Sequence, residues 1–570
     1  MCHPYRNILM VYPEFPATYW GMQYFLPLIG KKAIMPPLGL LTIAALTPAS
    51  YSIRLVDLNC VPLNDDDIEW ADIVCFSAML PQKPSLLDTA GRCRRAGKLL
   101  VFGGPYPTAC PAECTPHCDV LVLNEGEITW PMFLRDVEDG SYAALYTSDE
   151  KPDVSLTPVP HFTLLRVGDY GAIPIQFSRG CPFLCEFCDI IVMFGRKPRT
   201  KTPAQVLREL DAVYATGYRG MIFIVDDNFI GNKKAVKALL PELAAWNAGH
   251  GDPFFYGTEA TINLADDREL LELMVAAKFL WVFIGIETPS EEGLKETRKV
   301  QNLKGSMLDR VRVVQGSGLL VFGGFIIGFD SDAEDIFERQ IRFIEDAAIP
   351  NAMIGPIVAL PGTPLYARMK STGRLLEDDD AGGNRTVASG YTNVRTILPF
   401  DRLLDGHRRI LESIYSAPAY FRRTLEALRR LPYPPALAQR RRRLGWLISV
   451  GLDSLVRAVR HQPTIGSALL RLITLARAIR QLSPEYRRAS LQFTWDVLRR
   501  CPDQIGFVLP YVLMGYHYHK FTFEQVAPSL SNLVSAARSA DHPTHAALSG
   551  NPSSPNAEAV PGDRVQHPVS

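Results

Sequence analysis

The chain has 570 residues, and its 60 Lys and Arg balance its 60 Asp and Glu, so the formal net charge at pH 7 is zero. A chain of this length exceeds what one hydrophobic core usually organises, so we expect two or three domains. The neutral charge balance gives no electrostatic reason to expect a nucleic-acid partner.

The start of the chain and its cysteine usage indicate the compartment. No apolar segment follows a basic stretch at the start, as a signal peptide requires, and no apolar run is long enough to span a membrane. The 11 Cys lack the paired spacing of a disulfide scaffold. We therefore expect a cytoplasmic protein.

Residues 6–145 alternate short apolar runs with helical patterns. Strands are expected at 7–13, 52–59, 72–79, 98–105 and 119–127, and helices at 36–48 and 83–97. This alternation is typical of a doubly wound (Rossmann-like) α/β domain with a parallel sheet, whose ligands bind at the carboxyl ends of the strands. We assign residues 1–150 to this domain.

Small and acidic residues follow the later strands of this domain. They are Ser77, Gly103, Gly104, Glu125, Gly126 and Glu127. Glycines at strand ends let the backbone approach a bulky, flat ligand. The layout resembles a cobalamin-binding domain, which implies that these six residues contact cobalamin. Some corrinoid domains supply a His to cobalt, but no His lies between His3 and His117. In this the chain departs from that pattern, and we expect no protein histidine on the metal. The alternative is a doubly wound domain with another ligand or none.

Cys110, Cys114 and Cys118 form a first cysteine triplet within this domain. One interpretation is a second iron–sulfur cluster, as methylthiotransferases carry in an N-terminal domain. The other interpretation follows from the spacing of four, which places the thiols on one helical face as small buried apolar groups. We favour the second interpretation.

From about 170 to 370 the strand–helix alternation resumes with a regular period. Strands are expected at 173–177, 220–231, 254–263, 279–290, 318–332 and 351–365. A helix should begin after Thr202 as N-cap, with Pro203 in its first position. Six such units predict a partial (β/α)₆ barrel over residues 151–380, with its site at the carboxyl ends of the strands.

Cys181, Cys185 and Cys188 form a C-x-x-x-C-x-x-C loop directly after the first barrel strand. Iron–sulfur cubanes take one thiolate per iron, so three cysteines leave one iron open to a small chelating molecule. A zinc knuckle would need a fourth ligand, and the nearest His residues are remote in sequence. A disulfide would need an oxidising compartment. The loop resembles the signature of radical S-adenosylmethionine (SAM) enzymes, which implies a [4Fe-4S] cluster and places Phe187 near the adenine of SAM.

The same resemblance assigns SAM contacts to residues at the ends of later strands. They are Asp226, Asp227, Glu259, Glu287, Gly324 and Gly328. The acidic residues would meet the SAM amino group or ribose hydroxyls, and the two glycines would pass close to the adenine. Strand-end carboxylates also serve as helix caps or loop ion pairs, so which of them contacts SAM stays open. Arg179 and Arg196 flank the loop. For each of them three roles stay open: offsetting the negative charge of the cluster, binding a carboxylate of SAM or substrate, or facing solvent.

Helical periodicity dominates the late chain. We expect a helical domain over 381–540 and a disordered tail over 541–570, which is rich in Ser, Pro, Ala and Asn. The Arg-rich amphipathic segments 444–460 and 468–482 permit contact with an anionic membrane or a lipid-like substrate. The alternative, which we favour, is a helical cap with a solvated basic face.

The domain order resembles cobalamin-dependent radical SAM enzymes, and segments 12–25, 31–46 and 225–234 are most similar to the branch containing the hopanoid C-2 methylases. The resemblance implies a C-methyltransferase. It would cleave SAM reductively at the cluster, abstract hydrogen from an unactivated carbon and transfer a methyl group from methylcobalamin. It also implies a small-molecule, lipid-like or natural-product substrate and a one-electron reductase of flavodoxin or ferredoxin type. Alternatives are a non-methylating cyclisation or rearrangement, a methylthiotransferase and a corrinoid-binding sensor.

Overall fold

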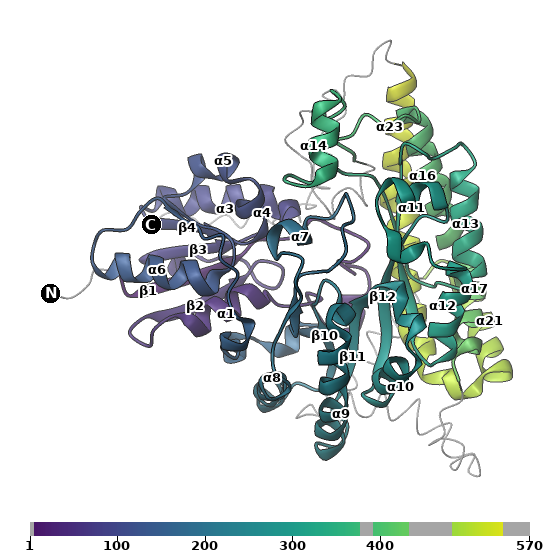
Figure 1. Cartoon of the computed structure of the whole chain (residues 1–570), viewed down its shortest axis with the longest axis horizontal. Coiled ribbons are helices and arrows are strands. Elements are labelled where there is room, and N and C mark those ends of the chain that lie inside the picture. Colours follow the sequence, from purple (N-terminus) through teal and green to yellow (C-terminus); the bar gives the residue numbers. More distant parts are fainter. Residues whose placement is uncertain (1–4, 377–390, 433–481, 540–570) are drawn as a thin grey trace, which may run out of the picture.

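The computed structural model describes residues 5–376, 391–432 and 482–539 (Figure 1). The Arg-rich segment 444–460, nearly all of 468–482 and the tail 541–570 lie outside these residues. An N-terminal α/β sheet, a second parallel sheet and a layer of late helices follow one another across the molecule (Figure 1). The α/β fold class expected from the sequence is confirmed.

The first sheet has six parallel strands in the order β2-β1-β3-β4-β5-β6. Their bounds are Asn7–Tyr12 (β1), Ser52–Asp57 (β2), Ile73–Ser77 (β3), Leu99–Gly103 (β4), Val120–Val122 (β5) and Leu145–Tyr146 (β6). The first five correspond to the expected strands. The two-residue edge strand β6 is an addition, since two residues carry no periodic pattern.

Helices cover both faces of this sheet, which explains why its strands read as continuous apolar runs. Helices α1 (Leu38–Leu46) and α6 (Gly126–Glu138) pack on the face that includes Ile8 and Met10. On the opposite face, Leu9 and Val11 contact a core formed with α2 (Asp65–Trp70), α3 (Lys83–Arg95), α4 (Pro105–Ala109) and α5 (Pro111–Cys114). Cys114 is fully buried in this second core, and burial raises the pKa of its thiol to about 11.

The second sheet also has six parallel strands, in the order β7-β10-β11-β12-β13-β14. Their bounds are Ala172–Ile175 (β7), Gly220–Ile224 (β10), Phe254–Ala260 (β11), Phe279–Glu287 (β12), Leu320–Ile327 (β13) and Ala352–Pro356 (β14). Each strand lies beside the next one along the chain, as in the expected partial barrel. The outer helices are α8 (Pro203–Ala215), α9 (Lys233–Gly249), α10 (Arg268–Ala276), α11 (Glu291–Glu296), α12 (Met307–Gly316) and α13 (Ile336–Asp346).

Local sequence fixes where helix α8 begins. Thr202 accepts a hydrogen bond from the backbone of Gln205, whose side chain accepts one from the Thr202 backbone, and Pro203 occupies the first turn. This capping box satisfies amide groups that the helix itself leaves free. Just before it, strands β8 (Ser178–Arg179) and β9 (Arg199–Thr200) form an antiparallel ribbon around the short helix α7 (Ile190–Met193).

The late helices share one hydrophobic core with the second sheet, except the first of them, which contributes Leu365 and Met369 to a smaller separate core. They are α14 (Pro364–Ser371), α16 (Phe400–Tyr415), α17 (Ala417–Arg430), α21 (Pro484–Arg500), α22 (Val508–Phe521) and α23 (Ala527–Ser539), with a π-helical turn over Thr522–Val526. Tyr415 donates a hydrogen bond to the carbonyl of Ala352 in β14, and the buried Arg423 donates to the carbonyls of Ile349 and Pro350. None of the helices in the described ranges is long and apolar enough to cross a bilayer.

The segment between β1 and α1 joins the N-terminal domain to the other two parts. The Tyr19 hydroxyl lies 2.8 Å from the Thr522 hydroxyl, and the Tyr19 carbonyl lies 3.0 Å from Nε2 of His517. The Trp20 ring meets the Phe283 ring of β12 edge to face, with 5.7 Å between centroids, and its indole N–H donates to the sulfur of Met353 in β14. We call residues 13–36 the strap.

Candidate active site

The three-cysteine loop leaves the carboxyl end of β7 and returns through the β8–β9 ribbon. Gly180, directly before Cys181, has φ of +93°, and a Cβ there would lie 2.8 Å from the carbonyl oxygen of Gly195. Only glycine fits this position without displacing the backbone. The Cys181 amide then donates to the same carbonyl, at 3.3 Å, which closes the base of the loop.

The sulfurs of the loop lie among N–H donors and one cation. Asn228 Nδ2 lies 3.8 Å from Cys181 Sγ, and Gln301 Nε2 lies 3.5 Å from Cys185 Sγ. Burial raises the pKa of Cys181, and the nearby Cys185 sulfur adds to this effect, whereas the Lys299 ammonium opposes it.

These neighbours fit a negatively charged thiolate-ligated cluster, because N–H donors and a cation stabilise charge on sulfur. No three His, Cys, Asp or Glu side chains in the described part of the chain are arranged to hold a single metal ion. The fit therefore rests on the donor set: three cysteines on one loop, with Gln301 Oε1 buried and unpartnered beside them.

Asp226 supports the loop from the end of β10. Its Oδ1 accepts a hydrogen bond from the Phe177 amide at 2.8 Å, and its Oδ2 accepts one from the Ser178 hydroxyl at 2.6 Å. The Asp226 side chain is buried, and both of its oxygens face the strand that enters the cysteine loop. The structure thus gives this residue, expected at SAM, a contact with the loop itself.

Asp227 and Glu259 form a close pair of carboxylates at the ends of β10 and β11. Burial raises the pKa of Asp227 to about 7 and the neighbouring Asp226 adds to the shift, while the Gly180 amide, 3.4 Å away, opposes it. Burial raises the pKa of Glu259 to about 8, and the charge of Asp227 adds to this effect. Such a pair favours a bound cation, which would relieve the repulsion between the two charges.

Glu287 ends β12 at a bulge, with φ of +65°. Its carboxylate forms a buried ion pair with Lys299, and a Cβ on Gly285 would lie 2.6 Å from the Lys299 ammonium. The ammonium also lies 5.8 Å from the Phe187 ring centroid. Sequence reasoning missed Lys299, because it follows a short helix and belongs to no strand end or motif. Sequence reasoning could have identified Asn228, since it directly follows the Asp226–Asp227 pair in the chain.

The two glycines expected near the adenine have different surroundings. A Cβ on Gly324 would lie 2.9 Å from the ring of Phe283, so the ring occupies the place of a side chain. Gly328 has φ of +95° just after β13, and its amide donates to Asp332 at 2.8 Å. Both positions exclude larger residues, which agrees with the expectation that the backbone here passes close to the adenine of SAM.

The residues expected at cobalamin lie at the carboxyl edge of the first sheet. Gly104 has φ of +89°, and a Cβ there would lie 2.5 Å from the Ser77 hydroxyl, so these residues are adjacent. A Cβ on Gly103 would lie 2.9 Å from the Val122 carbonyl, and one on Gly126 would meet Ile43 of α1. The absence of side chains at Gly103 and Gly104 therefore lets the neighbouring segments at this edge, around Val122 and Ser77, pack closely against them.

Glu125 and Glu127, also expected at cobalamin, face the cysteine loop. Arg179 Nη1 lies 2.7 Å from Glu125 Oε2, and its Nη2 lies 2.6 Å from Glu127 Oε1. Arg199 forms a second ion pair with Glu125, at 2.7 Å. Arg196, by contrast, donates to the Pro182 carbonyl at 3.3 Å in an exposed position.

Aromatic side chains line the inner face of the second sheet. The rings of Phe223 and Trp281 stack with 5.3 Å between centroids, and Trp281 stacks on Phe322 at 4.6 Å. Alternate residues such as Ile222 and Val282 are fully buried in the core on the helix side. The inner wall is therefore apolar below the carboxylates and the cysteine loop.

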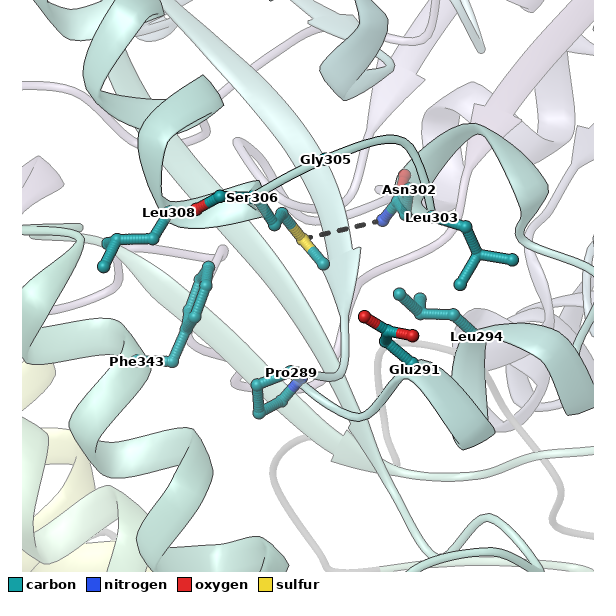
Figure 2. Close-up of a pocket in the computed structure, with 10 residues that line it drawn as sticks. Pro289, Glu291, Leu294, Asn302, Leu303, Gly305, Ser306, Leu308 and Phe343 are labelled. Atoms are coloured by element: carbon teal, nitrogen blue, oxygen red, sulfur yellow. Dashed lines mark hydrogen bonds between the residues drawn. The ribbon is translucent and has the colours of Figure 1, made fainter.

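A separate cavity of about 230 Å³ lies beyond the end of β12 (Figure 2). Asn302 and Leu303 line one side, with Leu308 and Phe343 opposite (Figure 2). None of the residues expected at the cofactors lines it, and Glu291 is its one titratable side chain. We assign no catalytic role to this cavity.

Comparison with known proteins agrees with this arrangement. Family models match the B12 binding domain over residues 31–134, the Radical SAM superfamily over 175–344 and a domain of unknown function over 363–529. The cobalamin-dependent SAM radical enzyme OxsB, solved with aqua-cobalamin and SAM, superposes with a TM-score of 0.56 at 15% identity, covering 92% of this chain and 84% of OxsB. The fold and site define a cobalamin-dependent radical SAM enzyme.

Two relatives identify the branch. An uncharacterized methyltransferase of Synechocystis sp. is 42% identical, over 75% of this chain and 79% of the relative. The hopanoid C-2 methylase of Rhodopseudomonas palustris is 38% identical, over 73% of this chain and 78% of the methylase. The chain belongs to this family of cobalamin-dependent radical SAM methyltransferases, which confirms the expected [4Fe-4S] cluster, SAM and cobalamin as its cofactors.

Proposed function

We propose that this methyltransferase acts on an unactivated carbon of an apolar, polycyclic substrate of the hopanoid type. The observation that carries the proposal is the aromatic inner wall of the half barrel, formed by Phe223, Trp281 and Phe322 with Phe283 and the strap residue Trp20. Flat aromatic surfaces bury large apolar areas and suit fused rings. The name of the hopanoid C-2 methylase, at 38% identity, supports the same substrate class.

The proposed roles follow from the placement of each residue. Cys181, Cys185 and Cys188 hold the [4Fe-4S] cluster, and Phe187 packs beside SAM. Asp227 and Glu259 accept hydrogen bonds from the amino group of SAM, because burial and neighbouring carboxylates raise their pKa values and N–H donors would stabilise their ionised forms.

The other edge of the site serves cobalamin. Ser77, Gly103 and Gly104 approach the corrin ring. When bound, the cluster with SAM supplies a hydrogen-abstracting radical and cobalamin supplies the methyl group. The protein residues bind, orient and exclude water, and a one-electron reductase of flavodoxin or ferredoxin type supplies electrons.

An exposed helix face supports membrane contact for an enzyme with such a substrate. Leu491, Trp495 and Leu498 are spaced along α21, and their exposed fractions are 71%, 62% and 43%. The exposed arginines Arg488 and Arg499 lie on the same helix. Trp and Leu beside Arg suit the surface of an anionic bilayer. Cosedimentation with phosphatidylglycerol vesicles should fall in a Trp495→Gln variant, and equal sedimentation would remove this part of the proposal.

The experiment for the proposed function is an anaerobic assay of reconstituted protein with SAM, dithionite, hydroxocobalamin and a hopanoid. We expect 5′-deoxyadenosine, S-adenosylhomocysteine and a product heavier by one methylene unit, all lost in a Cys185→Ser variant. 5′-Deoxyadenosine with a product of unchanged or rearranged mass would instead indicate the non-methylating alternative. About four irons per chain, rather than about eight, would exclude a two-cluster methylthiotransferase.

A further inference from the structure

Four charged side chains join the N-terminal domain to the base of the cysteine loop. Glu125 and Glu127 come from the start of α6, and Arg179 and Arg199 come from strands β8 and β9. The exposed fractions of these side chains are 2%, 11%, 11% and 14%. We call this group the clasp.

The hydrogen bonds of the clasp are bidentate. Arg179 Nη1 donates to Glu125 at 2.7 Å and to Glu127 at 3.0 Å, while its Nη2 donates to Glu127 at 2.6 Å. Arg199 donates to the two oxygens of Glu125 at 2.7 and 3.1 Å. Paired guanidinium and carboxylate groups fix orientation as well as distance. The two negative and two positive charges also balance, as a buried group requires.

Each side of the clasp is tied to one cofactor edge. Arg179 stands two residues before Cys181, and its Nε donates to Gln176 at 2.7 Å, so its side chain is held at both ends. On the other side, the amide of Asn124, directly before Glu125, donates to the Thr108 hydroxyl at 3.0 Å. Thr108 belongs to helix α4, which directly follows Gly104.

The clasp therefore forms one continuous link from the Gly104 turn to Cys181. Burial alone would raise the pKa of Glu127, but its hydrogen bonds with Arg179 more than offset this and lower the pKa. The N-terminus of α6 also favours negative charge in its first turn. The pair is thus held in its charged form, as a fixed link requires.

We propose that the clasp is a positioning device that sets the distance between the corrin edge and the cysteine loop, so that SAM at the cluster faces the cobalamin. Glu125, Glu127, Arg179 and Arg199 act as positioning residues for methyl transfer between the two cofactors. This inference rests on the proposed cofactor positions. A displacement of about 1 Å between reacting groups costs on the order of a hundredfold in rate, so a rigid link has a direct catalytic consequence.

The first test uses the cofactor-free full chain, so it is independent of the proposed function. The variant Glu127→Gln with Arg179→Gln removes one negative and one positive charge and leaves Glu125 paired with Arg199. We expect backbone amides of residues 124–128 and 178–200 to exchange hydrogen roughly tenfold faster, because the two segments lose their mutual restraint. The matched control, Arg54→Gln with Asp67→Asn, removes an ion pair elsewhere in the same domain and should leave both segments unchanged.

The single variants supply an internal check. Glu127→Gln or Arg179→Gln alone leaves an uncompensated buried charge, so each should raise exchange more than the neutral double variant does. If a single variant fails to fold, the double variant still tests the link. Exchange in the double variant equal to that of the parent would overturn the proposal.

The second readout separates positioning from structure. After reconstitution with iron, sulfide and hydroxocobalamin, the double variant should retain its iron and cobalamin content. With dithionite as the reductant that generates cob(I)alamin, S-adenosylhomocysteine formed from SAM, per bound cobalamin, should fall by at least roughly tenfold, and Arg179→Lys should restore part of it because the charge is kept. If the double variant instead forms as much S-adenosylhomocysteine per bound cobalamin as the parent, the clasp has a structural role only and the inference is overturned.

Discussion

At the scale of single residues, partners decide what each carboxylate of the site does. Asp226 and Asp227 are neighbours in the chain, yet Asp226 holds the loop through Phe177 and Ser178, and Asp227 faces Glu259 across the strand ends. Glu287 is neutralised by Lys299. Of the four acidic residues expected at SAM, Asp227 and Glu259 thus retain the shortage of positive charge that a SAM amino group would relieve.

The raised pKa values of Asp227 and Glu259 predict a pH dependence of stability. Their usual pKa values are 3.8 and 4.5. Burial raises them to about 7 and about 8, with a further increase from the charge of Asp226 on Asp227 and from the charge of Asp227 on Glu259. Between pH 4 and 8 the native state therefore binds more protons than the unfolded state. The contribution of these two carboxyls to the free energy of unfolding of the cofactor-free chain should therefore fall as pH rises through this window, by about 1.4 kcal/mol for each unit of pKa shift.

Denaturant titrations at several pH values measure this dependence. Asp227→Asn should flatten it, whereas the exposed Glu272→Gln should not. An unchanged slope in Asp227→Asn would contradict the assignment. By the same linkage, SAM should bind more tightly as pH rises through 7 to 8, because its amino group prefers the ionised pair.

At the scale of elements, backbone conformation at the strand ends shapes the site. Gly104 at the end of β4 and Gly180 in the cysteine loop both adopt positive φ with a neighbouring atom where a Cβ would lie. From the sequence, Gly104 stood out as a strand-end residue and Gly180 did not, and in the structure the reason for glycine at each position is a close approach between two segments. These turns place the first sheet's edge and the cysteine loop within reach of the clasp.

A pair of glycine variants separates backbone strain from lost space. Gly104 and Gly97 both have positive φ, at +89° and +71°, but a Cβ on Gly97 meets no atom within 4 Å. Gly97→Ala should cost about 1 kcal/mol of strain and leave cobalamin binding unchanged. Gly104→Ala displaces Ser77 and should weaken cobalamin binding at least roughly tenfold beyond that strain. Absorbance titration with hydroxocobalamin measures both, and equal affinities would contradict the placement of the corrin edge.

At the scale of the whole molecule, the cores are distributed unequally. The first sheet has two hydrophobic cores of its own, one on each face. The second sheet and the late helices other than α14 share a single core, to which the strap contributes Tyr19, Met22 and Leu26. The barrel and helices therefore form one cooperative body, with the N-terminal domain attached by the strap and the clasp.

Calorimetry should resolve two unfolding transitions in the cofactor-free chain, because separate cores unfold separately. Hydroxocobalamin at about 100 times its dissociation constant should stabilise the N-terminal transition by about 2.7 kcal/mol. The second transition should move less, since the ligand binds at the edge of the first sheet. A single transition shifted as a whole would instead indicate that the strap and clasp fuse the two bodies.

The sequence by itself determined the order of the domains, nearly every strand, the cap of α8 and the three-cysteine loop. These depend on local patterns: apolar runs, turn residues and cysteine spacing. It could not locate the two-residue strand β6 or the β8–β9 ribbon, because such short strands carry no periodicity.

The tertiary structure decided which distant side chains meet. Lys299 reaches the cysteine loop from beyond β12, and Trp20 reaches the barrel from the strap, although neither position stands out in the chain. From the sequence, Glu125 and Glu127 were expected only as cobalamin contacts. The tertiary structure shows that they form ion pairs with Arg179 and Arg199. Charge pairing across domains depends on packing in three dimensions, which residue spacing along the chain does not encode.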